Sequence, residues 1–374
     1  MFLLPLGLGR SGDQGRGEGG LPLAPTSGRQ VRPPCHGRVR RLPAFSPRPW
    51  SALRPKPEGR GSVALLLFLA TPAAAKTLAV GPGQPFDRPS AAIRAAQPGD
   101  TVLIEPGDYY DCAAWSTPSL TIAGRGPGAV LTDTTCQGKA ILVVGGANTT
   151  IRDLTLARAR VPDGNGAGIR LEAPGLRMEG VTFANDQAGL LSGVSSGVIV
   201  VAGCRFEGGG VAGPQPTYAI LAGSAATLLV SGSVFAGGQG GQVSSGAGET
   251  TLTGNSFAAP ATLPMVSASG PLTLTGNSFT AGPDAAGQPA AVLATGDAGP
   301  VLRGNRLLPS GRSLALLLDW TGGTPVLQGN QVAPGDQEVS TAGSLRHRAS
   351  GAAHGAKDEL RGLAGRAKRF ILGQ

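Results

Sequence analysis

The polar segment PDGNGAGIRLE, residues 162–172, concentrates side chains that are able to do chemistry. It holds Asp163, Asn165, Arg170 and Glu172. Carboxylate and amide oxygens bind calcium, and a guanidinium group binds a carboxylate through two parallel hydrogen bonds. Together these groups would form a surface for an acidic sugar or a hydrated calcium ion. The alternative is that DGNG is only a turn and that Arg170 is a solvated residue paired with Glu172.

Two further polar residues, Asn185 and Asp186, occur in the segment FANDQAGLL. They follow the first segment by about one period of the repeat described below, so a repeating fold would bring Asp186 close to the DGNG turn. If Ile169 points into a core, the alternation of strand side chains turns Arg170 and Glu172 outward on one face. The sequence therefore predicts one outward cluster of acids, amides and an arginine.

The elements that must position these residues are short strands in a repeat. The segment TLTGNSF occurs at residues 251–257 and again at 273–279, which is 22 residues later. Self-similarity at this period is typical of solenoids, and a varying step indicates one loop of free length in each turn. Weaker copies, at steps of 22 to 29 residues, end at Leu156, Phe183, Phe206, Phe235, Leu307 and Val332.

Each copy reads as a strand, a Gly-Asn turn and another strand, and a further apolar run such as AGIRL or YAILA precedes it. Two or three strands per turn, with no helix between them, predict an all-β parallel β-helix of about nine or ten coils. At one corner we expect a ladder of side-chain amides that bond backbone groups from coil to coil. Its members are Asn255, Asn277, Asn305 and Asn330.

The N-terminal end of the solenoid carries a predicted lid and a predicted disulfide. A short helix in SAAIRAAQP, with Ser90 as its N-cap, would cover the open strand edges. Cys112 and Cys136 lie 24 residues apart, one turn of the repeat, and we expect them to bridge adjacent coils. Cys204 has no such partner and is expected to be a buried apolar residue.

A second candidate site is the segment DYYD, residues 108–111. Tyr109 and Tyr110 would stack on sugar rings there, or Tyr109 would pack in the first coil against the lid helix. Aromatic residues make up only 4% of the chain, which is sparse for a long carbohydrate groove.

The segments GDTVLIEPGDYYD, LTIAGRGPG and GNGAGIRLE, with the repeat that follows, resemble secreted bacterial right-handed parallel β-helix proteins of the pectate-lyase-like superfamily. The resemblance covers most of residues 78–335. It implies that Arg170 is the base or charge neutraliser of a uronate lyase, and that Asp163, Glu172 and Asp186 bind calcium. The WxDH and RxPxxR segments of pectate lyases do not occur, nor do the NTD, DD and GHG segments of polygalacturonases.

The first 75 residues differ from the rest. Residues 1–59 are rich in Arg, Pro and Gly and lack periodicity, which predicts a disordered extension or a start codon placed too far upstream. Residues 60–75 carry the apolar run VALLLFLA before TPAAA, the order of a secretory signal. The β-helix domain, residues 76–340, is therefore expected to be secreted, periplasmic or held at the outer envelope.

Charge is distributed unevenly along the chain, whose formal net charge is +9. Residues 1–75 hold 11 basic and 3 acidic residues, and residues 341–374 hold 7 and 2. Residues 76–340 hold 14 and 18, a net charge of −4, which argues against nucleic-acid binding there. That part of the sequence also has no histidine, so the commonest general base near neutral pH is missing.

Residues 341–374 are predicted to form a basic amphipathic helix. Such a helix lies on an anionic membrane surface or folds back to cap the C-terminal coil, and the sequence leaves both open. The apolar stripe consists of Leu360, Leu363, Ala367, Phe370 and Ile371.

Two classes of function follow from the sequence. One is a protein that binds or processes polysaccharide through the cluster around Arg170, with calcium-assisted lyase chemistry. The other is a non-catalytic structural or attachment module of the cell envelope. A fold-level resemblance does not choose between them.

Overall fold

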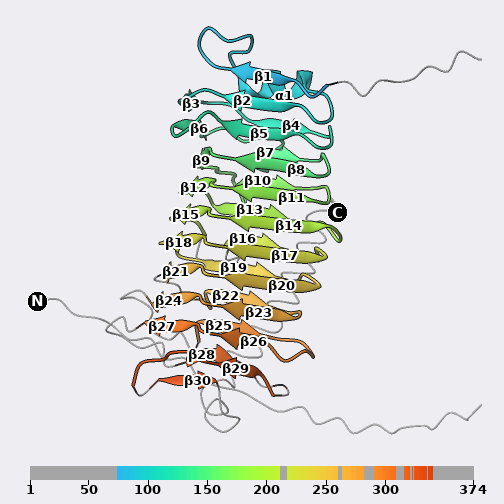
Figure 1. Cartoon of the computed structure of the whole chain (residues 1–374). Helices are drawn as coiled ribbons and strands as arrows, with labels where there is room; N and C mark the ends of the chain where they lie inside the picture. The colour runs from blue at the N-terminus through green and yellow to red at the C-terminus, as the bar shows by residue number, and fades with distance from the viewer. Residues whose placement is uncertain are drawn as a thin grey trace, which may run out of the picture. The chain divides into compact units, whose positions relative to one another are not determined.

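The computed structural model describes residues 74–210, 217–259, 263–281, 290–308, 316–320, 322, 324–334 and 336–339. This part of the chain is a parallel β-solenoid of about ten turns with very little helix (Figure 1). Each complete turn contributes one strand to each of three parallel sheets, which we name A, B and C in the order in which the chain visits them. The predicted parallel β-solenoid is thus confirmed.

From β2 to β29 the strands follow one another in rotation among sheets A, B and C. Sheet A contains β1 (Thr77–Val80), β2 (Thr101–Ile104), β5 (Thr121–Gly124), β8 (Thr149–Arg152), β11 (Leu176–Glu179), β14 (Val198–Ala202), β17 (Thr227–Ser231), β20 (Glu249–Thr253), β23 (Leu272–Thr275), β26 (Val301–Arg303) and β29 (Val326–Gln328). Sheet B contains β3 (Gly107–Tyr109), β6 (Ala129–Thr132), β9 (Thr155–Ala157), β12 (Thr182–Ala184), β15 (Arg205–Glu207), β18 (Val234–Ala236), β21 (Ser256–Ala259), β24 (Ser278–Ala281) and β27 (Arg306–Leu308). Sheet C contains β4 (Ala113–Trp115), β7 (Ala140–Val144), β10 (Ala167–Leu171), β13 (Ala188–Ser192), β16 (Tyr218–Ala222), β19 (Gly241–Ser245), β22 (Val266–Ala268), β25 (Val292–Ala294), β28 (Leu316–Asp319) and β30 (Gln337–Val339).

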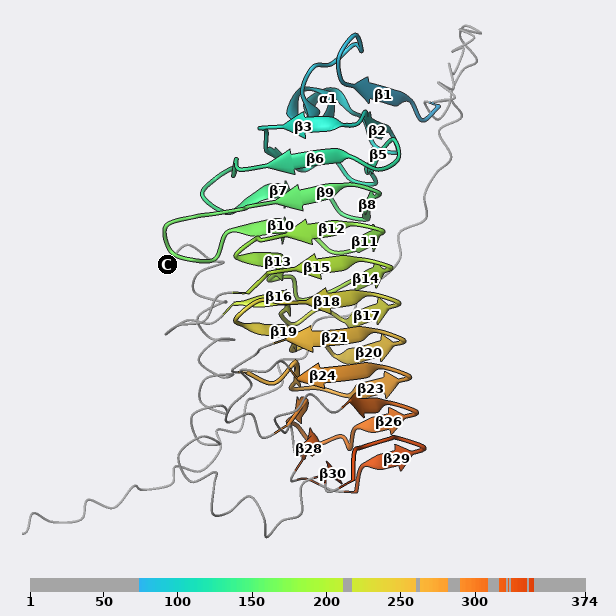
Figure 2. The ribbon, with the colours of Figure 1, turned by 90° about the vertical axis from the view of Figure 1, so that its left-hand side faces the viewer.

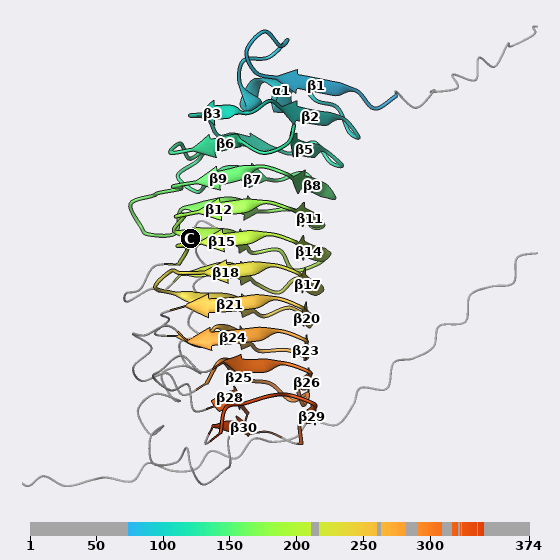
Figure 3. The ribbon, with the colours of Figure 1, turned by 60° about the vertical axis from the view of Figure 1, so that its left-hand side comes forward.

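The sequence repeat is in register in space. The two copies of TLTGNSF lie in neighbouring coils, with Thr251 paired to Thr273 in sheet A and Phe257 paired to Phe279 in sheet B. The apolar runs that precede each copy are strands of sheet C, as β10 and β16 show. Figures 2 and 3 show the same stack of coils from two other sides.

The core consists of columns of side chains that run from coil to coil. Five phenylalanine rings are stacked, with centroids 4.7 to 5.0 Å apart and interplanar angles between 3° and 13°. Gly168 in β10 faces this column, and a Cβ atom there would lie 2.7 Å from the first ring. Glycine is therefore required at that position. The column is formed by Phe183, Phe206, Phe235, Phe257 and Phe279.

The predicted amide ladder lies at the corner between sheets A and B. Asn277 Oδ1 accepts the backbone N–H and the Nδ2–H of Asn255, at 2.9 and 3.0 Å. Its own Nδ2 donates to the Leu252 carbonyl oxygen at 2.9 Å, and Asn305 repeats the pattern one coil later. The left-handed backbone at this corner belongs to the preceding glycine, as at Gly276 (φ 64°).

A seven-residue helix, α1, covers the first coils, but its cap differs from the prediction. α1 spans Pro89–Ala95, so the N-cap residue is Arg88 and not Ser90. The Ser90 N–H donates instead to Asp111 Oδ2 at 2.8 Å. A carboxylate from the following coil thus supplies the acceptor that the local sequence does not.

The predicted disulfide between Cys112 and Cys136 is confirmed, with Cα atoms 5.5 Å apart. It joins the residues between β3 and β4 to those between β6 and β7, which belong to neighbouring coils. Cys204 is a free cysteine and is buried, as the sequence predicts.

Three segments remain predictions because they lie outside the described residues. They are the extension at residues 1–59, most of the signal-like segment at 60–75 and the basic segment at 341–374.

The amide ladder makes a prediction about stability. Asn277→Ala would leave the buried Asn255 N–H and the Leu252 carbonyl oxygen without their side-chain partners. We expect the free energy of unfolding to fall by about 2 to 4 kcal/mol in urea denaturation. Thr273→Ala, on the half-exposed side of β23, is the matched control and should change stability by less than about 0.5 kcal/mol. Equal effects of the two substitutions would contradict the role of the ladder.

The disulfide makes a second prediction. The bridge closes a loop of 24 residues, and removing such a cross-link costs about 3 kcal/mol. The variant with Cys112→Ser and Cys136→Ser should therefore melt at a lower temperature than the oxidised wild type. Reductant should lower the melting temperature of the wild type and leave that of the variant unchanged. A wild type that is insensitive to reductant would contradict this prediction.

Candidate functional site

Polar side chains gather at the corner where each coil leaves sheet B for sheet C, which we call the B–C corner. The first residues after β6, β9 and β12 are Asp133, Arg158 and Asn185. All three have a left-handed backbone, with φ between 56° and 61°. Backbone hydrogen bonds cross the corner from coil to coil, for example from the Arg158 N–H to the Ala184 carbonyl oxygen. The corner therefore presents one side chain from each coil in a regular row.

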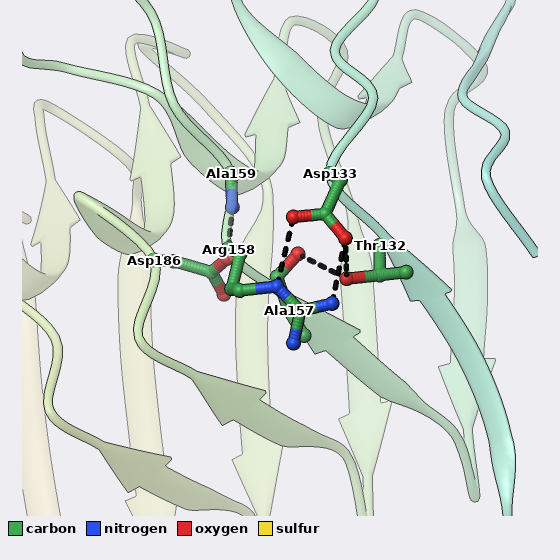
Figure 4. Close-up of polar contacts among 6 residues, drawn as sticks. All are labelled: Thr132, Asp133, Ala157, Arg158, Ala159 and Asp186. Carbon is green, nitrogen blue, oxygen red and sulfur yellow. Dashed lines mark hydrogen bonds and ion pairs between the residues drawn. The ribbon is translucent and has the colours of Figure 1, made fainter. Parts of the chain in front are cut away.

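Asp133 and Arg158 form a bidentate ion pair between neighbouring coils (Figure 4). Arg158 donates from Nε to Oδ1 at 2.8 Å and from Nη2 to Oδ2 at 2.6 Å. The hydrogen bonds from Arg158 lower the pKa of the Asp133 carboxyl, and the same bonds raise the pKa of Arg158. The Arg158 side chain is 54% exposed and that of Asp133 is 39% exposed, so the pair is open to a ligand and adds little to stability.

Asp186 is the buried acid of this corner, with 2% of its surface exposed. Its Oδ1 accepts the Ala159 N–H at 2.7 Å (Figure 4). Its Oδ2 has no hydrogen-bond partner in the described part of the chain and lies beside Gly168. Burial raises the pKa of the carboxyl well above the usual 3.8, and the bond from Ala159 offsets only part of this effect. Asp186 therefore holds its proton to a higher pH than an ordinary aspartate.

Gln187 and Arg160 hold the loop that contains the DGNG turn. Gln187 Oε1 accepts the N–H groups of Val161 and Gly166, each at 2.8 Å. Arg160 donates to the Asn185 carbonyl oxygen in the next coil. The loop is thus tied down at both ends by the coil that follows it.

The prediction that Arg170 faces solvent is wrong. Ile169 points into the core as expected, and Arg170 lies on the opposite side of β10, but only 3% of its surface is exposed. Its partners in register are Val143 and Leu191, which are themselves buried. Strand alternation determines the side of the sheet on which a residue lies, and it does not determine whether that side is open.

The ion pair expected between Arg170 and Glu172 is also absent from the described residues. Lys139 Nζ binds Glu172 Oε1 at 2.6 Å instead. Arg170 Nε is buried without a hydrogen-bond partner in the same part of the chain. Burial lowers the pKa of this guanidinium, and the charges of Glu172 and Asp163 act in the opposite direction.

The other predicted site residues are spread over the corner. Asp163 and Asn185 are exposed, and Asn165 is half-buried. Within the described ranges, no group of three or more His, Cys, Asp or Glu side chains is placed to hold a metal ion. The acids Asp163, Glu172 and Asp186 thus do not form a ready set of ligands there.

Tyr109 and Tyr110 have different environments. Tyr109 is 8% exposed, and its hydroxyl donates to the Glu105 carbonyl oxygen at 2.9 Å, so it belongs to the packed first coils. Tyr110 is 67% exposed. Asp108 and Tyr110 belong to the coil of β3, which pairs with β6, and β6 pairs with β9, so they lie two coils from Arg158.

Asp133 and Arg158 are not among the residues predicted from the sequence, although the repeat contains a signal for Arg158. Arg158 follows Leu156 by two residues, as Asn185 follows Phe183. Aligning the copies at these core positions places the two polar residues at one corner. Asp133 lies before the first recognisable copy of the repeat, which ends at Leu156, so no aligned copy contains it.

The fold defines the class of protein as a parallel β-solenoid. No protein-family model matches the sequence, and neither does any curated protein. Among the described residues, no helix has the length and apolar character that crossing a membrane would require.

Several solved structures are similar to this one. ORF18 of Geobacillus virus E2 has a TM-score of 0.50 and 14% identity, and the match covers 67% of this chain and 55% of that one. The PL6 family alginate lyase AlyGC has a TM-score of 0.47 and 16% identity, and the match covers 70% of this chain and 40% of that one. Pectin methylesterase PemA from Erwinia chrysanthemi has a TM-score of 0.43 and 11% identity, with 75% and 96% covered. At these identities the likeness concerns the fold, and the chain spans well under two thirds of the alginate lyase.

Asp186 makes a prediction about pH. The pKa of Asp186 is higher in the folded than in the unfolded chain. Its contribution to the free energy of unfolding should therefore fall as the pH rises from about 3.8 toward the pKa in the folded chain. Asp186→Asn keeps an oxygen for the Ala159 N–H and removes the charge. The variant should therefore be more stable than the wild type at pH 7, with a gain that shrinks as the pH falls toward 3.8.

Urea denaturation between pH 3 and pH 8 measures this gain, with the exposed Asp163→Asn as the control. A difference between Asp186→Asn and wild type that does not change with pH would show that Asp186 is not perturbed in this way.

Proposed function

We propose that the chain is a secreted protein that binds an acidic polysaccharide at its B–C corner. The observation that carries the proposal is a row of exposed side chains on three successive coils, with Tyr110 after β3, Asp133 after β6, and Arg158 and Arg160 after β9. The row spans three successive coils, so the surface extends along the solenoid. We call Asp108, Tyr110, Asp133, Arg158 and Arg160 the corner patch.

The corner patch has the groups that an acidic sugar requires. The Tyr110 ring offers an apolar face for a sugar ring, and its hydroxyl remains in water. Guanidinium groups bind carboxylates in planar geometry, and because Asp133 takes Nε and Nη2 of Arg158, a ligand carboxylate would approach from the Nη1 side. Asp133 already holds Arg158 in place, so less side-chain freedom is lost when a ligand binds.

The burial of Arg170 favours binding over lyase chemistry. A general base must come within hydrogen-bond distance of the proton that it removes. Arg170 is 3% exposed and lies between Val143 and Leu191. Its role as the base, with calcium held by Asp163, Glu172 and Asp186, stays a prediction.

An oxidising location is part of the proposal. The disulfide between Cys112 and Cys136 is of the kind that persists outside the cytosol, and residues 60–75 have the order of a secretory signal. A protein that binds an envelope polysaccharide without turnover also serves for attachment, which joins the proposal to the second class of function above.

The corner patch is tested by substitution. Tyr110→Ala and Arg158→Ala should each weaken binding to an acidic polysaccharide, such as polygalacturonate or alginate, by about tenfold, because stacking and a charged bond are each worth over 1 kcal/mol. Affinity electrophoresis in gels that contain the glycan measures the change. Arg177→Ala is the control, because Arg177 is equally exposed and forms an ion pair with Glu179 on sheet A.

Two outcomes would contradict the proposal. In one, the wild type migrates alike in gels with acidic and with neutral glycans. In the other, Arg177→Ala weakens binding as much as Arg158→Ala does. Ultraviolet absorbance of unsaturated uronates, with and without calcium, tests processing in the same samples. A calcium-dependent product that disappears in Arg170→Ala would establish a lyase instead.

A further inference from the structure

The outward residues of sheet C form a continuous column in which five members are buried and Leu221 and Leu293 are half-buried. They pair in register from β7 to β25, and we call them the outer column of sheet C. Four of the seven members are aliphatic, which is unusual for the outer side of a soluble sheet. The members are Val143, Arg170, Leu191, Leu221, Ser244, Ser267 and Leu293.

The burial of this column contrasts with the outer side of sheet A. Leu191 and Arg170 are 6% and 3% exposed, whereas Leu229 on the outer side of sheet A is 36% exposed. In the described part of the chain, the strands of sheet C contact their neighbours in the sheet, and α1 contacts β4 at the N-terminal end. No described helix or strand outside the sheet makes extensive contact with the column between β7 and β25, although Cys136, between β6 and β7, packs against the cluster that contains Val143 and Leu191.

We propose that residues 357–371 of the same chain pack on the outer column of sheet C. The apolar residues of this segment recur at intervals of three and four, so a helix would present them as one stripe. The stripe is apolar, and the column is mostly aliphatic with two small serines, which suits close packing. The stripe consists of Leu360, Leu363, Ala367, Phe370 and Ile371.

The length of the chain permits this contact. The last described strand, β30, belongs to sheet C and ends at Val339. The 21 residues from there to Leu360 span up to about 70 Å when extended. β13, which carries Leu191, is six strands from β30, or about 29 Å. A helix of 15 residues is about 22 Å long and would cover four or five coils.

Charge also favours the solenoid as the partner. Residues 341–374 carry a net charge of +5, and residues 76–340 carry −4. The basic residues Arg361 and Arg366 fall outside the apolar stripe. Arg170 is the one cation among the seven members of the column, and the charges of Glu172 and Asp163 act on it favourably.

The test measures how fast a thiol in the column reacts with a maleimide in the full-length chain. Leu191→Cys should react slowly, and Leu229→Cys on sheet A should react fast. Adding Leu363→Asp and Phe370→Asp should speed the reaction at Leu191→Cys by about tenfold or more and leave Leu229→Cys unchanged. Every variant also carries Cys35→Ser, and Cys204 does not interfere, because it is 1% exposed and burial raises its pKa to about 11.

A matched control separates packing from charge. Lys357→Ala with Arg366→Ala lowers the net charge by two, as Leu363→Asp with Phe370→Asp does, and spares the stripe. Leu191→Cys should stay protected in that background. Circular dichroism of each variant shows that the solenoid is intact.

Two results would overturn the proposal. The first is protection of Leu191→Cys that persists with Leu363→Asp and Phe370→Asp, or after deletion of residues 341–374, because another part of the chain or a second copy would then cover the column. The second is a Leu191→Cys that reacts as fast as Leu229→Cys while the full-length chain binds phosphatidylglycerol vesicles. That outcome would assign the segment to a membrane surface.

Discussion

Parallel pairing in register between successive coils is the constraint on which the rest of the structure depends. It places every residue of a strand about 4.8 Å from its equivalent in the next coil. Side chains therefore do not pack as individuals but as columns, and each column has one chemical character over several coils. The stacked rings from Phe183 to Phe279 and the amides from Asn255 to Asn330 are two such columns.

A polar column inside the solenoid is stable only when each member satisfies the one before it. The amide oxygen of Asn277 accepts hydrogen bonds from the backbone and side-chain N–H groups of Asn255. The amide oxygen of Asn255 accepts one from the Ser233 N–H. The ladder then passes to Ser233 Oγ, which accepts the Cys204 N–H. Side chains with fewer hydrogen-bonding groups thus continue the column toward the N-terminal coils. Burial of an unsatisfied amide would be costly, so the ladder changes residue type before it ends.

These columns explain how much of the fold was predictable. A heptapeptide that is repeated with strand periodicity indicates that equivalent residues stack in neighbouring coils. The solenoid and the amide ladder were therefore predictable from the sequence. The spacing of Cys112 and Cys136 equals one turn, so their pairing also followed. The cap of α1 was not predictable, because its acceptor is Asp111, which is 21 residues from Ser90 and meets it only after the coil closes.

The candidate site was less predictable for a related reason. Alternation along β10 correctly placed Ile169 inside and Arg170 outside, but it carries no information on what lies over the outer side of the sheet. The pairing of Glu172 with Lys139 joins residues 33 apart in sequence and depends on the register of two coils. The row of Asp133 and Arg158 required an alignment of copies that are too short and too varied to be recognised by composition.

The B–C corner shows how a repeat leaves room for function. The left-handed position after sheet B is occupied by Asp133, Arg158 and Asn185 in three early coils and by Gly208 and Gly237 in the next two. Glycine adopts the left-handed backbone at the lowest energetic cost. Each of the three non-glycine residues in the early coils therefore costs more conformational energy than glycine would at the same position. Asp186 adds a second cost there, because its buried carboxyl resists ionisation. Strain and burial of this kind, confined to a few coils of an otherwise regular column, mark the part of the solenoid that stacking alone does not explain.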